Sequence, residues 1–401
     1  MNPKNIVIIG GGTAGWLCAL YLIKFCKDSK ITLIESTKIG ILGAGEGSVP
    51  MFVDFLKIID INEEEFVFRT DSTYKLGVDF KRWKNDTSKY IHYFYLNDSY
   101  SFHFNARLAA EFFKEKAIQR GVIHIDDNVL DFTINDSNDV DGIILDVNEN
   151  ISCDFVFNCM GMGNTQLHEM YNLQWVSYSD SLTVNSALPY FLPQLDKDIK
   201  YTDTKAIAMK YGWMWQIPLK NRIGCGYVYD DNYIGEAEAK LEIEEYLGYE
   251  ITPNRSIKFK SGAYDKAWVN NVMFLGLSGG FIEPLEATSI MHGMKQLRLL
   301  NKYMFDVPDR DGFNSAIFEH SKEIMCFIYY HYLSNRGDTQ FWKHYNYENS
   351  PEELKKIINQ ELDVVLKTTG ELRKLFPNAK AYELGNWNII NGGIKMKRKL
   401  L

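Results

Sequence analysis

In Asn5-Ile-Val-Ile-Ile-Gly-Gly-Gly-Thr-Ala-Gly15, a β-branched run leads directly into a glycine-rich turn. Short apolar runs of this kind are typical of strands buried in parallel sheets. Residues 16–25 are apolar and rich in helix formers, and a second β-branched run at residues 31–34 ends in Glu35. The chain therefore opens with a predicted strand–helix–strand unit.

The spacing of the glycines predicts what this unit binds. Gly10 permits a tight turn, Gly12 lets the backbone approach a pyrophosphate, and Gly15 allows the helix to pack closely. Glu35 lies 20 residues after Gly15, where an acid can accept hydrogen bonds from a ribose. We predict a dinucleotide-binding unit. The motif alone does not separate NAD from FAD, but Ala19 and the lack of a second fingerprint for a nicotinamide favour FAD.

Composition excludes several classes of protein. The 401 residues are 46% apolar and 24% charged, as in ordinary globular proteins of two or three lobes. Acidic residues outnumber basic ones by 52 to 44, which argues against a nucleic-acid partner. The six cysteines and eight histidines show no metal-ligand spacing, so we assign no metal. No signal peptide or membrane span is evident, and we expect a cytoplasmic protein without a membrane partner.

Three further stretches identify a family. They are Ile41-Leu-Gly-Ala-Gly-Glu-Gly-Ser-Val-Pro50, Tyr211-Gly-Trp-Met-Trp-Gln-Ile-Pro-Leu219 and Gly276-Leu-Ser-Gly-Gly-Phe-Ile-Glu-Pro-Leu-Glu-Ala-Thr-Ser-Ile290. These resemble the GxGEx(S/T)xP, WxWxIP and G-L-(A/S)-x-G-F-x-E-P-L-E segments of flavin-dependent halogenases, the tryptophan halogenase family. Weaker matches at residues 75–83, 102–106, 158–161, 330–332 and 341–342 follow in the family's order, so the resemblance covers almost the whole chain.

The resemblance implies an α/β fold, a Rossmann-type FAD-binding fold of the flavin monooxygenase and halogenase kind. The resemblance further implies that this fold carries a β-rich substrate-side insertion and a helical C-terminal part. We expect a discontinuous FAD-binding module at residues 1–170 and 265–305, a β-rich substrate-side segment at 171–264, and a helical region at 306–401. The oligomeric state stays open.

The resemblance also implies the reaction. A separate flavin reductase supplies reduced FAD, and O2 and a halide ion are co-substrates that give hypohalous acid. This acid passes along an internal tunnel to a lysine beside an electron-rich aromatic substrate of the indole, phenol or pyrrole type. By match to the family, the lysine is Lys75, whose ammonium can polarise the acid. Glu286 matches the family's essential glutamate, which can orient Lys75, stabilise positive charge on the ring and remove its proton.

Further residues take their expected roles from the same matches. The expected cofactor contacts are Gly10, Gly12, Thr13, Ala14, Gly15, Glu35, Ala44, Glu46, Leu277 and Ile290. Backbone N–H groups of Thr288 and Ser289 would hold halide, and the expected substrate or tunnel wall is Trp213, Trp215, Pro218, Phe102 and His103. Trp213 and Trp215 alternate with Met214, so both indoles should project to one face of a strand. Core packing remains an equal alternative for them, and Ala287 departs from the serine that many members carry.

The remaining patterns are less specific. Residues 107–120 read as a helix and residues 129–147 as a hairpin. Ser350-Pro-Glu-Glu353 resembles a helix start, and apolar residues from Leu354 to Val365 follow at helical spacing until Gly370. The chain ends soon after Trp387, earlier than longer family members, so we expect an open arene pocket and a large or tethered substrate.

Two alternatives remain from the sequence. A single-component FAD-dependent aromatic hydroxylase would share the dinucleotide unit, but Lys75 and the two tryptophans argue against it. A non-catalytic flavin-binding protein would not need Lys75 and Glu286.

Overall fold

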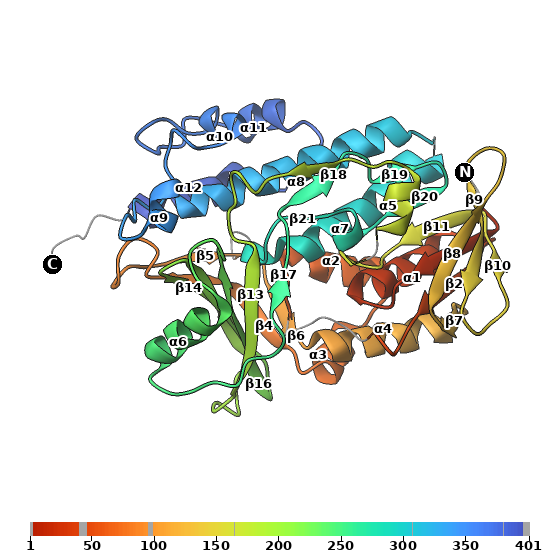
Figure 1. Ribbon diagram of the computed structural model, residues 1–401, viewed down its shortest axis with the longest axis horizontal. Coiled ribbons are helices and arrows are strands. Elements are labelled where there is room, and N and C mark those ends of the chain that lie inside the picture. Colours follow the sequence, from red (N-terminus) through yellow and green to blue (C-terminus); the bar gives the residue numbers. More distant parts are fainter. Residues whose placement is uncertain are drawn as a thin grey trace.

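The computed structural model describes residues 3–39, 46–94, 99–163, 165–306, 308–379 and 381–395. A Rossmann-type half and a half built on a larger sheet lie side by side, and the long helix α8 (Arg310–Tyr332) extends along both (Figure 1). Within the described ranges, no helix is both long and apolar enough to cross a membrane. The six cysteines are buried free thiols.

The Rossmann half contains a six-stranded sheet in the order β19-β20-β11-β1-β2-β7. Central strand β1 pairs in parallel with β2 and β11, and α1 follows β1 directly. The predicted strand–helix–strand unit is therefore confirmed. The bounds are β1 Asn5–Ile9, α1 Thr13–Phe25, β2 Lys30–Glu35, β7 Ile123–Asp126, β11 Phe155–Asn158, β19 Trp268–Val269 and β20 Val272–Phe274.

The turn between β1 and α1 depends on Gly10. Its φ is +112°, and a Cβ at this position would lie 2.4 Å from the carbonyl oxygen of Cys159. The loop after β11 is thus packed directly on the glycine turn. Gly12 is the N-cap of α1 and offers no capping side chain, so the first N–H groups of the helix remain available to an anion.

The other half is a nine-stranded mixed sheet in the order β17-β13-β16-β15-β14-β4-β6-β3, with β5 paired to β4. Strands from residues 46–104 and from residues 186–258 share it. The predicted boundaries differ from this arrangement, because residues 46–104 were expected in the FAD-binding module. The bounds are β3 Glu46–Gly47, β4 Thr73–Lys81, β5 Lys89–Tyr93, β6 Ser101–Phe104, β13 Ser186–Pro193, β14 Tyr201–Met209, β15 Gly212–Pro218, β16 Arg222–Tyr229 and β17 Ile257–Lys258.

A β-bulge in β4 decides which way Lys75 points. Thr202 of β14 pairs with Lys75, but the next residue, Asp203, pairs with Gly77, so Leu76 is the extra residue. Side chains alternate with a period of two along a strand, and one inserted residue reverses the phase. Lys75 therefore shares the inner face of the sheet with Val78 and Phe80, which belong to the main hydrophobic core.

Helices and small strands complete the fold. The predicted helix at 107–120 is confirmed as α4 (Ala106–Gln119), and the hairpin at 129–147 as β8 (Val129–Ile134) and β9 (Val140–Leu145). The other elements are α2 Pro50–Ile58, α3 Glu63–Arg69, β10 Ile151–Ser152, α5 Gln166–Met170, β12 Trp175–Ser177, α6 Glu236–Leu247, β18 Gly262–Tyr264, η1 Gly276–Ser278, β21 Gly280–Phe281, η2 Leu285–Ala287, α7 Thr288–Leu300, the π-helical turn η3 Asn301–Asp306, α9 Gln340–His344, α10 Glu352–Lys355, α11 Thr369–Leu375 and α12 Leu384–Lys395.

The helix predicted to run from Pro351 past Val365 is wrong. Only α10 forms, and the chain then turns: the Asn359 side chain accepts from the Asp363 N–H at 2.8 Å, and Leu362 has φ 62°. Local side-chain hydrogen bonding of this kind competes with a helix. Gly370, expected to break the helix, instead lies in α11, which Thr368 and Glu371 cap.

The Gly10 turn yields a prediction for stability. Gly10→Ala should lower the free energy of unfolding by about 2 kcal/mol or more, because it combines a left-handed residue with a steric clash. Gly121 is a matched control, since its φ is +100° but a Cβ there meets nothing within 4 Å. Gly121→Ala should cost only about 1 kcal/mol. Urea unfolding curves measure both, and equal losses would contradict the clash.

Candidate active site

Lys75 is the buried amine of the site. Its side chain is 1% exposed, and its Nζ lies 5.1 Å from the centroid of the Phe94 ring. On another side, Nζ lies 3.3 Å from the position that a Cβ on Gly47 would take. Burial lowers the pKa of Lys75 to about 8, although the nearby charges of Glu286 and Asp203 oppose this shift. The amine is thus both desolvated and easily deprotonated.

Glu286 is held in a strained turn before α7. Its φ is 63° and that of Ala287 is 56°, so two consecutive residues with side chains occupy the left-handed region. This conformation is costly and persists only where the surroundings enforce it. Glu286 is 4% exposed, and its charge acts on Lys75. The structure therefore brings the two residues, which are far apart in sequence, into one buried cluster.

Two histidines clamp the Glu286 carboxylate. Its Oε1 accepts from His92 Nδ1 at 2.8 Å and from His331 Nε2 at 3.2 Å. The other ring nitrogens also face oxygen acceptors, Asn386 Oδ1 at 2.9 Å and the Phe327 carbonyl at 2.8 Å. Only an imidazolium donates from both nitrogens, so the contacts of His92 suit a cationic ring beside an ionised carboxylate.

The pKa shifts of Glu286 and His92 agree with these hydrogen bonds. Burial alone would raise the pKa of Glu286, but the two histidines hold it well below its usual range. Burial alone would lower the pKa of His92, but Glu286 raises it. Glu286 is therefore a carboxylate at any physiological pH.

A second buried acid, Glu283, connects the site to the tryptophan strand. It accepts from Trp213 Nε1 at 3.1 Å and from the Tyr332 hydroxyl at 3.0 Å. Burial raises the pKa of Glu283 to about 8. Trp213 and Trp215 lie in the same core cluster while Met214 lies in another, which confirms that both indoles project to one face. By strand pairing, this is the face that carries Lys75.

The predicted halide residues lie at the N-terminus of α7. The Thr288 hydroxyl donates to the Glu283 carbonyl at 3.0 Å, and no side chain caps the helix. A cavity of about 10 Å³ adjoins them, with room for about one water molecule. It is lined by Gly262, Ala263, Gly280, Phe281, Ile282, Thr288, Ser289, His292 and Ser321.

The glycine turn has the features that a dinucleotide requires. A Cβ on Gly12 would meet nothing within 4 Å, and the buried Thr13 hydroxyl has no hydrogen-bond partner among the described residues. Glu35 ends β2 and accepts from Lys114 Nζ at 2.7 Å and His124 Nε2 at 3.0 Å. These residues fit a pyrophosphate at the start of α1 and a ribose at Glu35.

Other expected cofactor residues lie near this turn or outside the described structure. A Cβ on Gly276 would lie 3.0 Å from the Cβ of Ala14, which places η1, with Leu277, against the glycine turn. Ile290 lies in the first turn of α7 and is half-buried. Ala44 lies outside the described residues, and only the backbone of Glu46 is described.

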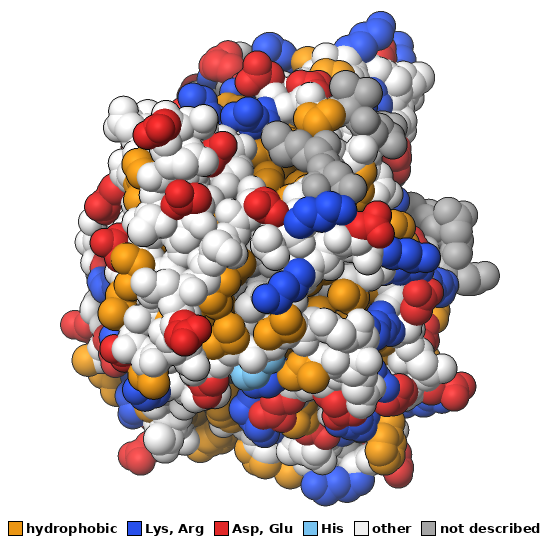
Figure 2. Space-filling model, turned by 90° about the vertical axis from the view of Figure 1, so that its right-hand side faces the viewer, with side chains coloured by type: hydrophobic (Ala, Val, Ile, Leu, Met, Phe, Trp, Pro, Cys, Tyr) orange, Lys and Arg blue, Asp and Glu red, His pale blue; other side chains and the backbone are white. Residues whose placement is uncertain are grey.

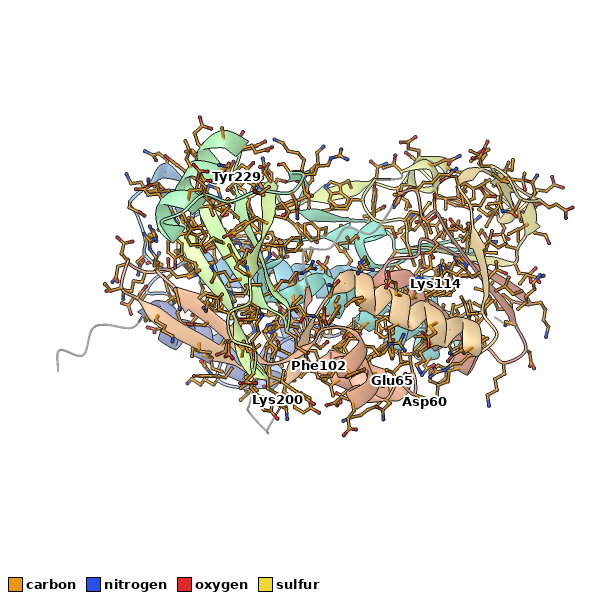
Figure 3. The ribbon with its side chains drawn as sticks, turned by 90° about the horizontal axis from the view of Figure 1, so that it is seen from below. Asp60, Glu65, Phe102, Lys114, Lys200 and Tyr229 are labelled. Atoms are coloured by element: carbon orange, nitrogen blue, oxygen red, sulfur yellow. The ribbon has the colours of Figure 1, made fainter. Side chains whose placement is uncertain are left out.

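The two expected wall residues on β6 face opposite ways. Phe102 pairs with Tyr74, and its ring centroid lies 5.7 Å from that of Phe66 in α3. It therefore lies on the face of the sheet away from Lys75. Figure 3 shows Phe102 beside α3. It therefore does not line an approach to Lys75. His103 lies on the Lys75 face, fully buried, as a hydrogen-bonded neighbour of two threonines rather than an open wall. Pro218 ends β15, and its carbonyl accepts from Thr73.

The expected open pocket is wrong. Lys75 is buried, and α12 packs against β5, where Asn386 reaches His92 and Gly393 abuts the Tyr90 ring. The C-terminal segment thus covers the site.

Sequence reasoning missed His92, Phe94, His331 and Asn386. The alternation Tyr90-Ile-His-Tyr-Phe94 could have placed His92 and Phe94 on one face of a strand, but nothing in the sequence pairs His92 with Glu286.

The same clamp is the group among the described residues that could hold a metal ion. One ligand atom from each of His92, Glu286 and His331 lies within 4.8 Å of the others. These atoms already satisfy one another as hydrogen-bond donors and acceptor.

The surface on the Rossmann side carries both charges. On the face in Figure 2, Lys and Arg side chains are interspersed with Asp and Glu, so the electrostatic field there is mixed.

Fold and site together define a Rossmann-type dinucleotide-binding protein with a second, buried polar centre in its larger sheet. The tryptophan halogenase family model matches residues 5–99 and 95–396. Tryptophan 6-halogenase SttH of Streptomyces toxytricini is 30% identical over 90% of this chain and 84% of its own. Its crystal structure superposes with a TM-score of 0.89 at 28% identity, covering 98% of this chain and 91% of that chain. Tryptophan 7-halogenase RebH of Lentzea aerocolonigenes is 29% identical over 84% of this chain and 78% of its own.

The chain therefore belongs to the tryptophan halogenase family. It is an enzyme of the flavin-dependent halogenase class, and the family implies FAD and a halide ion.

The buried amine yields a second prediction. A lysine pKa lowered from its ordinary value to about 8 corresponds to about 3 kcal/mol of lost stability at neutral pH. Lys75→Met should thus raise the free energy of unfolding at pH 7 by up to about that amount. This loss of stability is present in full below pH 8. It disappears as the pH approaches the pKa of a lysine in the unfolded chain. Chemical unfolding at pH 7 and pH 10 tests this, and an equal gain at both would contradict it.

Proposed function

We propose that this protein is a two-component halogenase that transfers an oxidised halogen to an electron-rich aromatic ring. Reduced FAD from a separate flavin reductase would, with O2 and halide, supply hypohalous acid. The observation that carries the proposal is Lys75, a buried ammonium near the clamped Glu286 carboxylate. The substrate class is a small aromatic compound of the indole, phenol or pyrrole type.

Lys75 activates the hypohalous acid. Its ammonium donates a hydrogen bond to the oxygen of the acid, which makes the halogen more electrophilic. When ring carbon attacks the halogen, a carbon–halogen bond forms and the halogen–oxygen bond breaks. The departing hydroxide takes a proton from Lys75 and leaves as water.

Glu286 acts on the aromatic ring of the substrate. Its carboxylate stabilises the positive charge that develops on the arene. A carboxylate with a strongly lowered pKa is a weak base, but a ring cation is a strong acid, so Glu286 can accept its proton and return it to Lys75. The balance is ArH + HOX → ArX + H2O. The two histidines keep Glu286 ionised and in place.

The other half of the molecule would hold the cofactor. Gly12, Thr13 and the start of α1 would bind the pyrophosphate, and Glu35 the ribose. Backbone N–H groups of Thr288 and Ser289 would hold halide. Trp213, which donates to Glu283, and its neighbour Trp215 would form a wall that separates the substrate from the flavin.

The defining experiment combines the protein with FAD, a generic reductase, NADH, O2 and each halide against a panel of arenes, with products read by mass. Halogenated arene supports the proposal. Hydroxylated arene, or FAD reduction by NADH without the reductase, would favour a single-component hydroxylase.

Lys75→Ala gives the third prediction. The variant should still consume O2 in a halide-dependent manner but yield at least about 100-fold less halogenated arene, because removing a catalytic acid typically costs this much. Lys240→Ala, which removes a lysine paired with Glu244 on α6, is the control for loss of one lysine. Unchanged product from Lys75→Ala would remove Lys75 from the mechanism.

A further inference from the structure

The Lys75 amine and the Thr204 hydroxyl both lie close to Gly47. A Cβ on Gly47 would lie 3.3 Å from Lys75 Nζ, 3.4 Å from Thr204 Oγ1 and 3.6 Å from His103 Cδ2. Lys75 comes from β4 and Thr204 from the neighbouring strand β14. Any side chain at position 47 would therefore contact both the amine and the hydroxyl.

Hydrogen bonds fix the direction of the Thr204 hydroxyl. Thr73 Oγ1 donates to the Pro218 carbonyl at 2.7 Å, so it accepts from His103 Nδ1 at 3.1 Å. Burial and the Lys75 charge lower the pKa of His103, which leaves its ring neutral. Its bare Nε2 then accepts from the Thr204 hydroxyl at 2.8 Å.

A small species held between Lys75 and Thr204 would therefore meet one donor and one acceptor. The Thr204 proton is committed to His103, so its oxygen offers only lone pairs. The Lys75 ammonium offers only N–H donors. A species held between them must accept from Lys75 and donate an O–H to Thr204, which matches a small neutral acid HO–X and disfavours a bare anion.

We propose that Thr204, above Gly47, completes the subsite where Lys75 holds hypohalous acid. The inference rests on the proposed function and deepens it. Thr204 accepts from the O–H while Lys75 donates to the same oxygen, so the halogen end is left free for the arene. After the halogen–oxygen bond breaks, the oxygen keeps its hydrogen, gains one proton from Lys75 and leaves as water. His103 is a positioning residue, because it acts only through Thr204.

The test compares Thr204→Val with Thr204→Ser. Valine keeps the shape of threonine but has no acceptor, whereas serine keeps the acceptor. Thr133→Val, which removes a strand hydroxyl in the β8–β9 hairpin, is the matched control. Each variant is run as full-length enzyme with FAD, a reductase, NADH, O2 and bromide. Halogenated arene and free oxidant captured by monochlorodimedone are both measured, and their ratio reports retention of the acid.

Thr204→Val should lower the ratio of arene product to captured oxidant by about ten-fold, as expected for one lost hydrogen bond. Total oxidant should stay close to wild type, because the variant loses the acid rather than failing to form it. Thr204→Ser should restore the ratio. Gly47→Ala, which places a methyl group against both Lys75 Nζ and Thr204 Oγ1, should lower the ratio as Thr204→Val does.

A wild-type ratio in both Thr204→Val and Gly47→Ala would overturn the subsite and would mean that Lys75 and Thr204 hold at most ordered water between them. A ratio in Thr133→Val as low as in Thr204→Val would overturn it too. If wild-type enzyme gives oxidant but no halogenated arene, the proposed function itself fails. If wild type halogenates and Lys75→Ala does not, while Thr204→Val matches wild type, only the Thr204 assignment fails.

Discussion

The burial of one amine is the constraint on which the site depends. An ammonium at the Lys75 position loses nearly all its hydration, and this loss is costly unless charges and dipoles replace water. The bulge at Leu76 turns the side chain inward, Gly47 leaves space beside it, and Glu286 and Asp203 offset part of the desolvation. The result is an amine that remains charged at neutral pH but gives up its proton readily.

The ionisation of the Glu286 carboxylate near this amine is also fixed by its surroundings. A free buried glutamate would protonate, as Glu283 does when only neutral donors surround it. Glu286 differs because two histidines donate to the same oxygen. The left-handed turn at Glu286 and Ala287 both presents the carboxylate and starts α7, so the acid and the helix N-terminus that would hold halide are coupled in one piece of backbone.

The parts of the fold that depend on short stretches of sequence could be predicted. The β-branched run and glycines of β1–α1 obey turn and packing geometry, so the Rossmann unit was predicted and confirmed. The catalytic roles of Lys75 and Glu286 were predicted only through the resemblance of their motifs to those of the family. The His92–Glu286 pair could not be found, because strand β5 and the η2 turn meet only in the folded chain. The helix expected after Pro351 failed since hydrogen bonds around Asn359 favoured a turn, and Phe102 was misplaced because no pattern told which face of β6 meets Lys75.

The most direct measurement is the pKa of Lys75 itself. Protein labelled with ¹⁵N at lysine Nζ, titrated by NMR and compared with Lys75→Met to assign the resonance, reports it without any cofactor. A midpoint near pH 8 is expected, because burial lowers the pKa of Lys75 while the Glu286 charge opposes part of the shift. A midpoint near the ordinary lysine value of about 10.4 would show that the amine is solvated, and would contradict the buried donor on which the proposed chemistry rests.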